Sequence, residues 1–184
     1  SLINSEEGVL YAEISALADD TIQQIGIYGD SSSKQIRIEI NNSSVRAHLY
    51  NGSYQASMSS TQTVTNFNKI AFKFAENNFA LWINGVEVAT DNSGNTFPAN
   101  TIDRLNLTNF NGSTNLVKAK TKALAVYKTA LTDASLRCLT YPPAVATTFD
   151  LDFDTIAEQF TFTRGSEATF VNAQGLIQST ASND

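Results

Sequence analysis

Cysteine is almost absent from the chain, and long apolar runs are absent altogether. A single cysteine, Cys138, excludes an internal disulfide and a cysteine-rich zinc site. Because Cys138 lies in an apolar helical stretch, we expect its thiol to be buried and inert. No apolar run approaches the roughly 20 residues of a membrane helix, so we expect no insertion into a membrane. The single histidine, His48, excludes a metal site built on two histidines.

Positive charge is scarce as well. The 184 residues include 12 Lys and Arg against 18 Asp and Glu, which gives a net charge of −6 and a pI near 4.7. A phosphate-binding surface needs concentrated positive charge, and no basic cluster occurs, so we exclude nucleic acid as a partner. Most of the polarity comes from Asn, Ser and Thr, which favour turns and strand surfaces. The length is sufficient for one domain with a substantial core.

Short segments of alternating apolar and polar residues run through the chain. In residues 36–40 the isoleucines point to one face, while Arg37 and Glu39 point to the other. Polar turns separate these segments at spacings typical of an antiparallel all-β sandwich. The expected strands comprise residues 9–17, 22–28, 36–40, 45–49, 70–74, 79–90 as a hairpin, 102–109 and 118–127.

The clearest local signal is the Asn84-Gly85 pair inside the segment FALWINGVEVAT, residues 79–90. Two alternating runs meet at this pair, which is the strongest short-range indication of a two-residue β-hairpin. Asn and Gly both tolerate the positive φ that a type I′ turn requires at its two central positions. The pair therefore fixes strand direction and pairing register locally.

One short helix is expected at residues 132–139. Thr132 is a suitable N-cap, and Asp133 in the first turn favours the positive end of the helix. Leu136 and Leu139 supply a short apolar stripe. The helix ends before two consecutive prolines, which begin a linker.

The change of character after this helix sets the expected domain organisation. Residues 1–140 form the sandwich, and residues 141–184 form a linker and a C-terminal strand segment. That segment either closes the sandwich or starts a following module. Its expected strands are residues 149–153, 160–164 and 169–171.

The order of these elements resembles the concanavalin A-like lectin/glucanase superfamily, including laminin-G domains. The strand at 69–73, the Asn-Gly hairpin at 81–88 and the phrase VYKTALTDASL at 126–136 carry the resemblance. It covers about residues 7–140 and implies a jelly-roll β-sandwich that binds sugars. Laminin-G relatives often hold a calcium ion at the rim of the sandwich.

A second resemblance concerns the C-terminal segment. FTFTRGSEAT at 160–169 and NAQGLI at 172–177 are similar to a phrase of bacteriophage tail and other virion proteins, where it introduces a lectin-like module. The resemblance implies a structural or adhesion protein of the virion, extracellular when assembled and part of a larger or oligomeric assembly. No signal peptide or initiating Met is visible at Ser1, as expected for a piece of a longer protein.

Sugar sites on such sandwiches combine an aromatic surface with polar groups that match sugar hydroxyls. Arg46, His48 and Tyr50 share one face of an expected strand. Arg37 and Glu39 join them if residues 34–40 and 45–50 pair as a hairpin. We take this face as the candidate ligand-binding surface, although an ordinary solvated sheet face is the simpler interpretation.

Trp82, the sole tryptophan, is a further ligand-binding candidate. Strand alternation places it on the face opposite Leu81 and Ile83. It stacks on a sugar ring if that face is exposed and belongs to the core if the face is covered. We favour the core.

The loop that contains Asp91, Asn92 and Asn95 is the candidate metal site. Oxygen ligands at alternating positions suit calcium, which is the one cofactor expected if the chain holds any. The loop lacks the bidentate acidic ligand near its end, so a plain turn is the simpler interpretation.

No catalytic motif is recognisable. Glucanases of the superfamily use a Glu-x-Asp-x-x-Glu arrangement, whereas this chain has Asp150, Asp152 and Asp154, which an amphipathic strand explains more simply. We therefore expect a non-enzymatic module of a phage virion that binds cell-surface glycans for host adhesion. One alternative is an architectural module that contacts other virion proteins and binds no sugar. A glycoside hydrolase is the second alternative.

Overall fold

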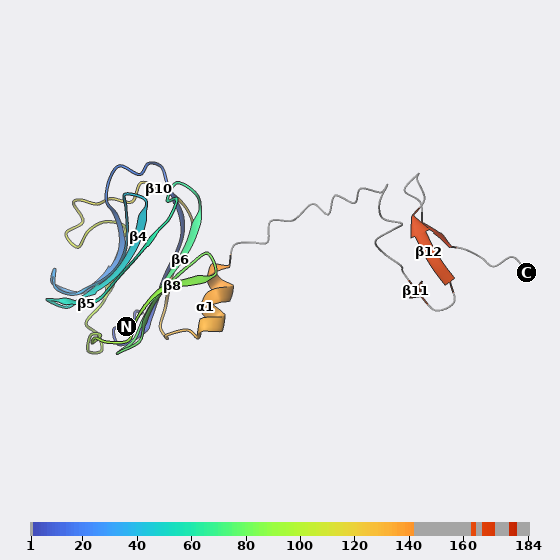
Figure 1. Cartoon of the computed structure of the whole chain (residues 1–184). Helices are drawn as coiled ribbons and strands as arrows, with labels where there is room; N and C mark the ends of the chain where they lie inside the picture. Colours follow the sequence, from blue (N-terminus) through green and yellow to red (C-terminus); the bar gives the residue numbers. More distant parts are fainter. Residues whose placement is uncertain (1, 142–162, 165–166, 172–176, 180–184) are drawn as a thin grey trace, which may run out of the picture. The chain divides into compact units, whose positions relative to one another are not determined.

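The computed structural model of the chain describes residues 2–141, 163–164, 167–171 and 177–179. The chain divides into two compact units, Ser1–Pro143 and Ala144–Asp184. The first unit consists of two antiparallel sheets that pack face to face, with one short helix on the outside (Figure 1). The all-β sandwich expected from the sequence is confirmed.

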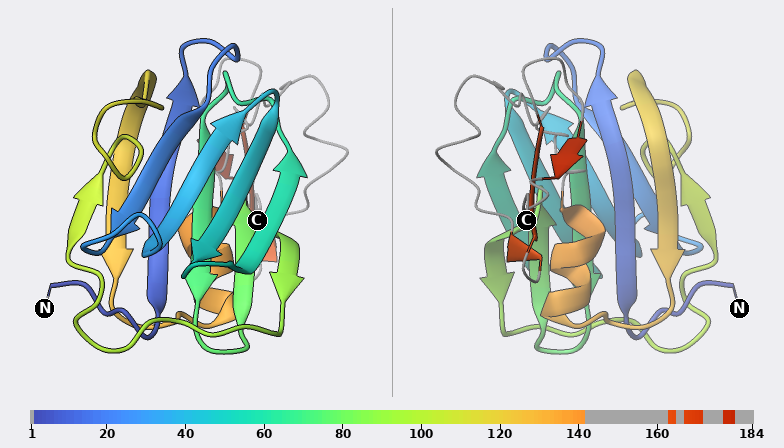
Figure 2. Two further views of the ribbon diagram at one scale, coloured as in Figure 1. Left: turned by 90° about the vertical axis from the view of Figure 1, so that its left-hand side faces the viewer. Right: turned by 90° about the vertical axis from the view of Figure 1, so that its right-hand side faces the viewer.

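Each sheet of the sandwich has five strands. Sheet A contains, in spatial order, β10 (Ala119–Tyr127), β1 (Gly8–Ala16), β6 (Asn68–Phe74), β7 (Phe79–Ile83) and β8 (Val86–Asp91). Sheet B contains β5 (Tyr54–Thr61), β4 (Ser44–Tyr50), β3 (Gln35–Asn41), β2 (Gln23–Tyr28) and β9 (Arg104–Asn106). The chain passes from one sheet to the other after β1, β5, β8 and β9, as in a jelly roll. Figure 2 shows the two sheets from their outer sides.

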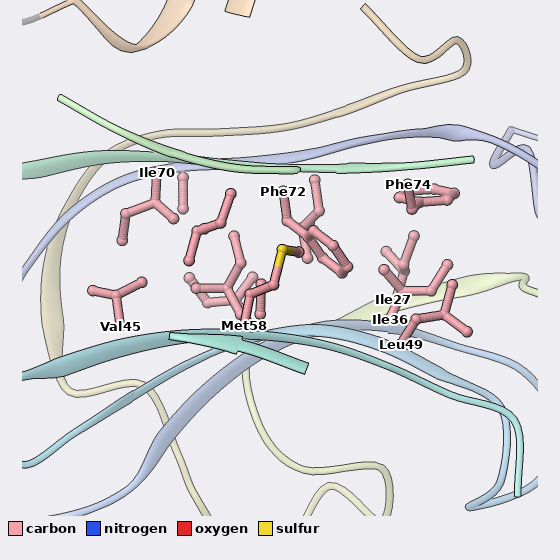
Figure 3. Close-up of a cluster of buried hydrophobic side chains, with 14 of the residues drawn as sticks. Ile27, Ile36, Val45, Leu49, Met58, Ile70, Phe72 and Phe74 are labelled. Atoms are coloured by element: carbon pink, nitrogen blue, oxygen red, sulfur yellow. The ribbon is translucent and has the colours of Figure 1, made fainter. Parts of the chain in front are cut away.

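The alternating side chains of both sheets meet between them and form the main core. Phe74 of β6 lies opposite Ile36 of β3 and Leu49 of β4, and all three are fully buried (Figure 3). Burying one such side chain contributes about 1.5–3 kcal/mol to the free energy of unfolding. Because successive strand residues face opposite sides, the same alternation sends Arg37 and Arg46 outward.

The Asn84-Gly85 turn joins β7 to β8 as expected. Asn84 has a φ of 51° and Gly85 a φ of 83°, the left-handed values of a type I′ turn. The Asn84 side chain accepts a hydrogen bond from the Lys69 amide at 2.9 Å, and the Gly85 amide donates to Thr140 Oγ1 at 3.1 Å. The hairpin turn is therefore tied to β6 and to the end of the helix.

The helix α1 (Asp133–Thr140) covers β6 and β7 on the outer face of sheet A (Figure 2, right). The predicted N-cap is confirmed, because the Thr132 side chain accepts a hydrogen bond from the Ser135 amide. Within the part of the chain that the structure describes, no helix has the length and apolar character needed to cross a membrane.

The expectation of a buried Cys138 is wrong, since this thiol is exposed. Leu136 faces the sheet and is fully buried. Two residues at about 100° each turn Cys138 to the far side of the helix. The short apolar stripe of Leu136 and Leu139 therefore does not include position 138, which is why the expectation for Cys138 fails.

Three short antiparallel strands are described in the second unit. They are β11 (Thr163–Arg164), β12 (Glu167–Val171) and β13 (Ile177–Ser179), paired in that order. The strand expected at residues 149–153 and the aspartates Asp150, Asp152 and Asp154 lie outside the described residues. Whether residues 141–184 close the sandwich or start a following module stays a prediction.

Candidate functional site

The candidate side chains lie on the outer face of sheet B, which is in front in the left view of Figure 2. The pairing of β3 with β4 places Arg37 opposite His48 and Glu39 opposite Arg46. Directly opposed residues of antiparallel strands have neighbouring side chains on one face. The hairpin on which the sequence prediction depended, between residues 34–40 and 45–50, is therefore present. It brings the polar side chains of the two strands together.

Glu39 is the electrostatic centre of this group. Its Oε1 lies 3.2 Å from Arg46 Nη1, and its Oε2 accepts a hydrogen bond from Gln24 Nε2 at 2.9 Å. Arg37 Nε lies 3.8 Å from the same Oε2. Glu39 and Arg37 are buried, whereas the Arg46 side chain is 37% exposed. A buried carboxylate held by several donors is a fixed support for the guanidinium that remains in solvent.

Three aromatic rings lie next to these charges. The Tyr54 ring is 5.2 Å from the His48 ring and 5.2 Å from the Tyr50 ring, measured between centroids. Arg37 Nη2 donates to the Tyr54 hydroxyl at 3.3 Å, which helps to orient that ring. Tyr54 is 57% exposed, so much of it is available to a ligand.

His48 is neutral at neutral pH. Burial of the imidazole, followed by the nearby Arg37 guanidinium, lowers the pKa of His48 to about 4. Its Nδ1 is buried without a hydrogen-bond partner among the described residues. A neutral imidazole can donate from one ring nitrogen and accept at the other, so Nδ1 is an unsatisfied polar atom enclosed beside the aromatic rings.

On the opposite half of this face, the outward side chain of Tyr28 in β2 is covered by Thr108 and Phe110. The Tyr28 ring lies across Gly26, where an added Cβ would be 2.4 Å from the ring atom Cζ. Its hydroxyl donates to the Thr108 carbonyl at 2.9 Å, and Phe110 packs edge-on at a centroid distance of 6.0 Å. This burial raises the pKa of Tyr28 to about 12. The covered half of the sheet thus borders the more open half formed by β4 and β5.

Trp82 does not belong to this group of side chains. It lies on the outer face of sheet A, in a second apolar cluster with Tyr11 and Leu136, and is 7% exposed. Helix α1 covers that face, so the structure supports the core interpretation. Trp82 and the group of Arg46 and His48 lie on opposite outer faces of the sandwich.

The loop after β8 forms a side-chain-stabilised turn. Asp91 Oδ1 accepts hydrogen bonds from the Ser93 amide at 3.0 Å and the Ser93 hydroxyl at 2.8 Å. The Asn95 amide donates to Gln55 Oε1 at 3.1 Å, which ties the loop to β5. Among the described residues, no group of three or more His, Cys, Asp and Glu side chains is arranged to hold a metal. Calcium binding by Asp91, Asn92 and Asn95 stays a prediction.

Comparison with known proteins places the fold in a family. The family model described as the concanavalin A-like lectin/glucanases superfamily matches residues 11–137. The chain belongs to this superfamily. No curated protein matches the chain in sequence.

Solved structures of this superfamily fold share low sequence identity with the chain. The CBM40 module of a Ruminococcus gnavus IT-sialidase, solved with α2,3-sialyllactose, has a TM-score of 0.62 at 19% identity, covering 75% of this chain and 84% of that one. A leech intramolecular trans-sialidase has a TM-score of 0.62 at 20% identity, covering 74% and 23%. Domains LG4-5 of the mouse laminin α1 chain have a TM-score of 0.52 at 9% identity, covering 71% and 38%. At these identities the likeness shows the fold.

The superfamily resemblance did not single out Tyr54, the most exposed aromatic residue of the site. Its strand, β5, has the sequence YQASMSST. Small residues occupy both faces of this strand, so the alternation of apolar and polar residues is weak. The Asn51-Gly52 pair before it was the available signal, because such a pair often joins two hairpin strands. A two-residue turn at that pair would place Ser53 opposite Tyr50 and send Tyr54 to the other face. The structure instead pairs Tyr50 with Tyr54, next to an irregularity in the register of β4 with β5.

Proposed function

We propose that this module binds glycans through the outer face of β3, β4 and β5 and catalyses no reaction. The observation that carries the proposal is the ring cluster of His48, Tyr50 and Tyr54 beside the Arg46 guanidinium. Aromatic rings offer flat apolar area to the C–H face of a sugar, and adjacent charged groups hydrogen-bond its hydroxyls. The carbohydrate-binding module named above, solved with a sialyllactose, supports glycan binding by this fold.

The arrangement of carboxylates supports a non-catalytic role. Glycosidases usually place two carboxyl groups about 5–9.5 Å apart across the bond they cleave. On the described strands of sheet B, Glu39 is the one carboxylate, and it is bound to Arg46 and Gln24. A carboxylate so engaged lacks a partner for acid–base chemistry on this face.

We further propose that the module serves in host-surface adhesion on a phage virion, as part of a tail or fibre. The support is the similarity of residues 160–177 to a phrase of virion proteins. Several copies in one assembly would convert a weak contact at each site into firm attachment. An architectural module that packs against other virion proteins and binds no sugar is the competing proposal.

A pair of tyrosine variants tests glycan binding. The purified chain is applied to a broad glycan array, and the affinity of each hit is measured by calorimetry. Tyr54→Ala should weaken binding about tenfold or more, because it removes the exposed stacking surface. Tyr141→Ala is the matched control, since Tyr141 is 54% exposed and Tyr54 57%. Equal affinity of both variants would refute the assigned surface, and silence across the array would favour the architectural module.

A further inference from the structure

The charge on sheet B is opposite in sign to that of the chain. Its five strands carry four charged residues, Arg37, Arg46, Arg104 and Glu39, whereas the whole chain has a net charge of −6. The strand pairing places all four on the outer face: Arg37 lies opposite His48, Glu39 opposite Arg46, and Arg104 opposite Tyr28. Local positive charge of this kind attracts anionic ligands even on an acidic protein.

Arg46 is the group that can meet such a ligand. Its Nη1 is held by Glu39 at 3.2 Å, while its Nε and Nη2 have no partner among the described residues. Glu39 is itself fixed by Gln24 and faces Arg37 as well, so one carboxylate serves two guanidinium groups. The Nε–Nη2 edge of Arg46 is therefore oriented, partly exposed and not neutralised.

The spacing suits one sugar ring. Arg46 and His48 are two residues apart on β4, which corresponds to about 7 Å along the strand. Tyr54 packs against His48 at 5.2 Å. A pyranose that stacks on Tyr54 can thus extend a substituent over His48 toward Arg46.

Building on the proposed function, we propose that this face selects glycans containing a sugar carboxylate. The planar Nε–Nη2 edge of Arg46 accommodates a carboxylate through two parallel N–H···O bonds. The sugar ring packs on Tyr54, whose ring is in turn supported by the His48 ring. The ligand class is an acidic sugar, such as a hexuronic or nonulosonic acid, within a surface glycan.

The test compares each acidic glycan with its own methyl ester, which keeps the shape and removes the charge. An array of hexuronic and nonulosonic acid oligosaccharides is printed in both forms and probed with the full chain. The free acid should bind about tenfold or more tightly than the ester, and added salt should narrow the difference. Arg46→Gln should abolish the preference. Arg46→Lys, which keeps the charge and loses the fork, should retain part of it.

Arg104→Gln is the matched control, because the Arg104 side chain is 38% exposed and that of Arg46 37%. It removes the same charge from the same sheet and should leave the preference intact. Equal binding of acid and ester would overturn the acidic selectivity and leave glycan binding standing. A preference that survives Arg46→Gln would overturn the assignment to Arg46. Absence of binding to every glycan in either form, on this array and on the broad one, would overturn both proposals.

Discussion

The titration of His48 can serve as a probe of the electrostatics of the candidate site. Burial and the Arg37 guanidinium lower its pKa from 6.5 to about 4. Because the unfolded chain binds a proton more readily, the stability contributed by the neutral imidazole is fully present above pH 6.5. It is lost as the pH falls from 6.5 toward about 4. Without screening the fall in pKa corresponds to about 3 kcal/mol, and solvent screening at the partly exposed site reduces this to about 1–2 kcal/mol.

Two measurements check this prediction. His48 is the only histidine, so its imidazole protons give an unambiguous NMR titration in the folded chain. Urea unfolding between pH 4 and 7 should show a steeper loss of stability for the native chain than for His48→Gln, since the contributions of the carboxylates cancel in the comparison. A titration midpoint near 6.5, or equal pH dependence of the two proteins, would refute the reasoning. A bound sugar carboxylate beside Arg46 should raise the midpoint.

Three further predictions concern the surroundings of the site. Gly26→Ala should lower the free energy of unfolding by about 2 kcal/mol, because the new Cβ meets the Tyr28 ring; the loss measured in urea should shrink in a Tyr28→Leu background. Leu136→Ala should cost about 3 kcal/mol and shift the fluorescence of Trp82, the sole tryptophan, to longer wavelength, and an unchanged spectrum would contradict the packing of α1 on Trp82. Cys138 should react with a thiol reagent in the native chain as fast as in urea, whereas strong native protection would show a buried thiol.

The sandwich was predictable because its pattern is local and repeated. The isoleucines of β3 alternate with Arg37 and Glu39, and the Asn84-Gly85 pair supplies the φ values that the turn needs. Each of these signals spans only a few residues. The local sequence alone was enough to predict most strands of the sandwich and the turn between β7 and β8, but not β5, whose alternation is weak.

The composition of the site was predictable only in part, because it depends on pairing between strands. Arg46, His48 and Tyr50 share a face by alternation along one strand. Tyr54 reaches them only through the register of β4 with β5, which contains an irregularity between Leu49 and Tyr50. Similarly, the burial of Trp82 is decided by helix α1, about 50 residues further along the chain, which no pattern within β7 reveals.

The location of the candidate site follows from what covers the two outer faces. On sheet A, α1 packs Leu136 against the cluster that contains Trp82. On sheet B, the segment 107–117 covers Tyr28, whereas Tyr54 and Arg46 near the β5 edge stay in contact with solvent. There, the supporting contacts of Glu39 and Arg37 fix the exposed groups before any ligand arrives. A ligand that meets groups already in place loses less of its binding free energy to ordering. This favours a ligand-binding role for the face over the ordinary solvated sheet face, which was the simpler interpretation of the sequence.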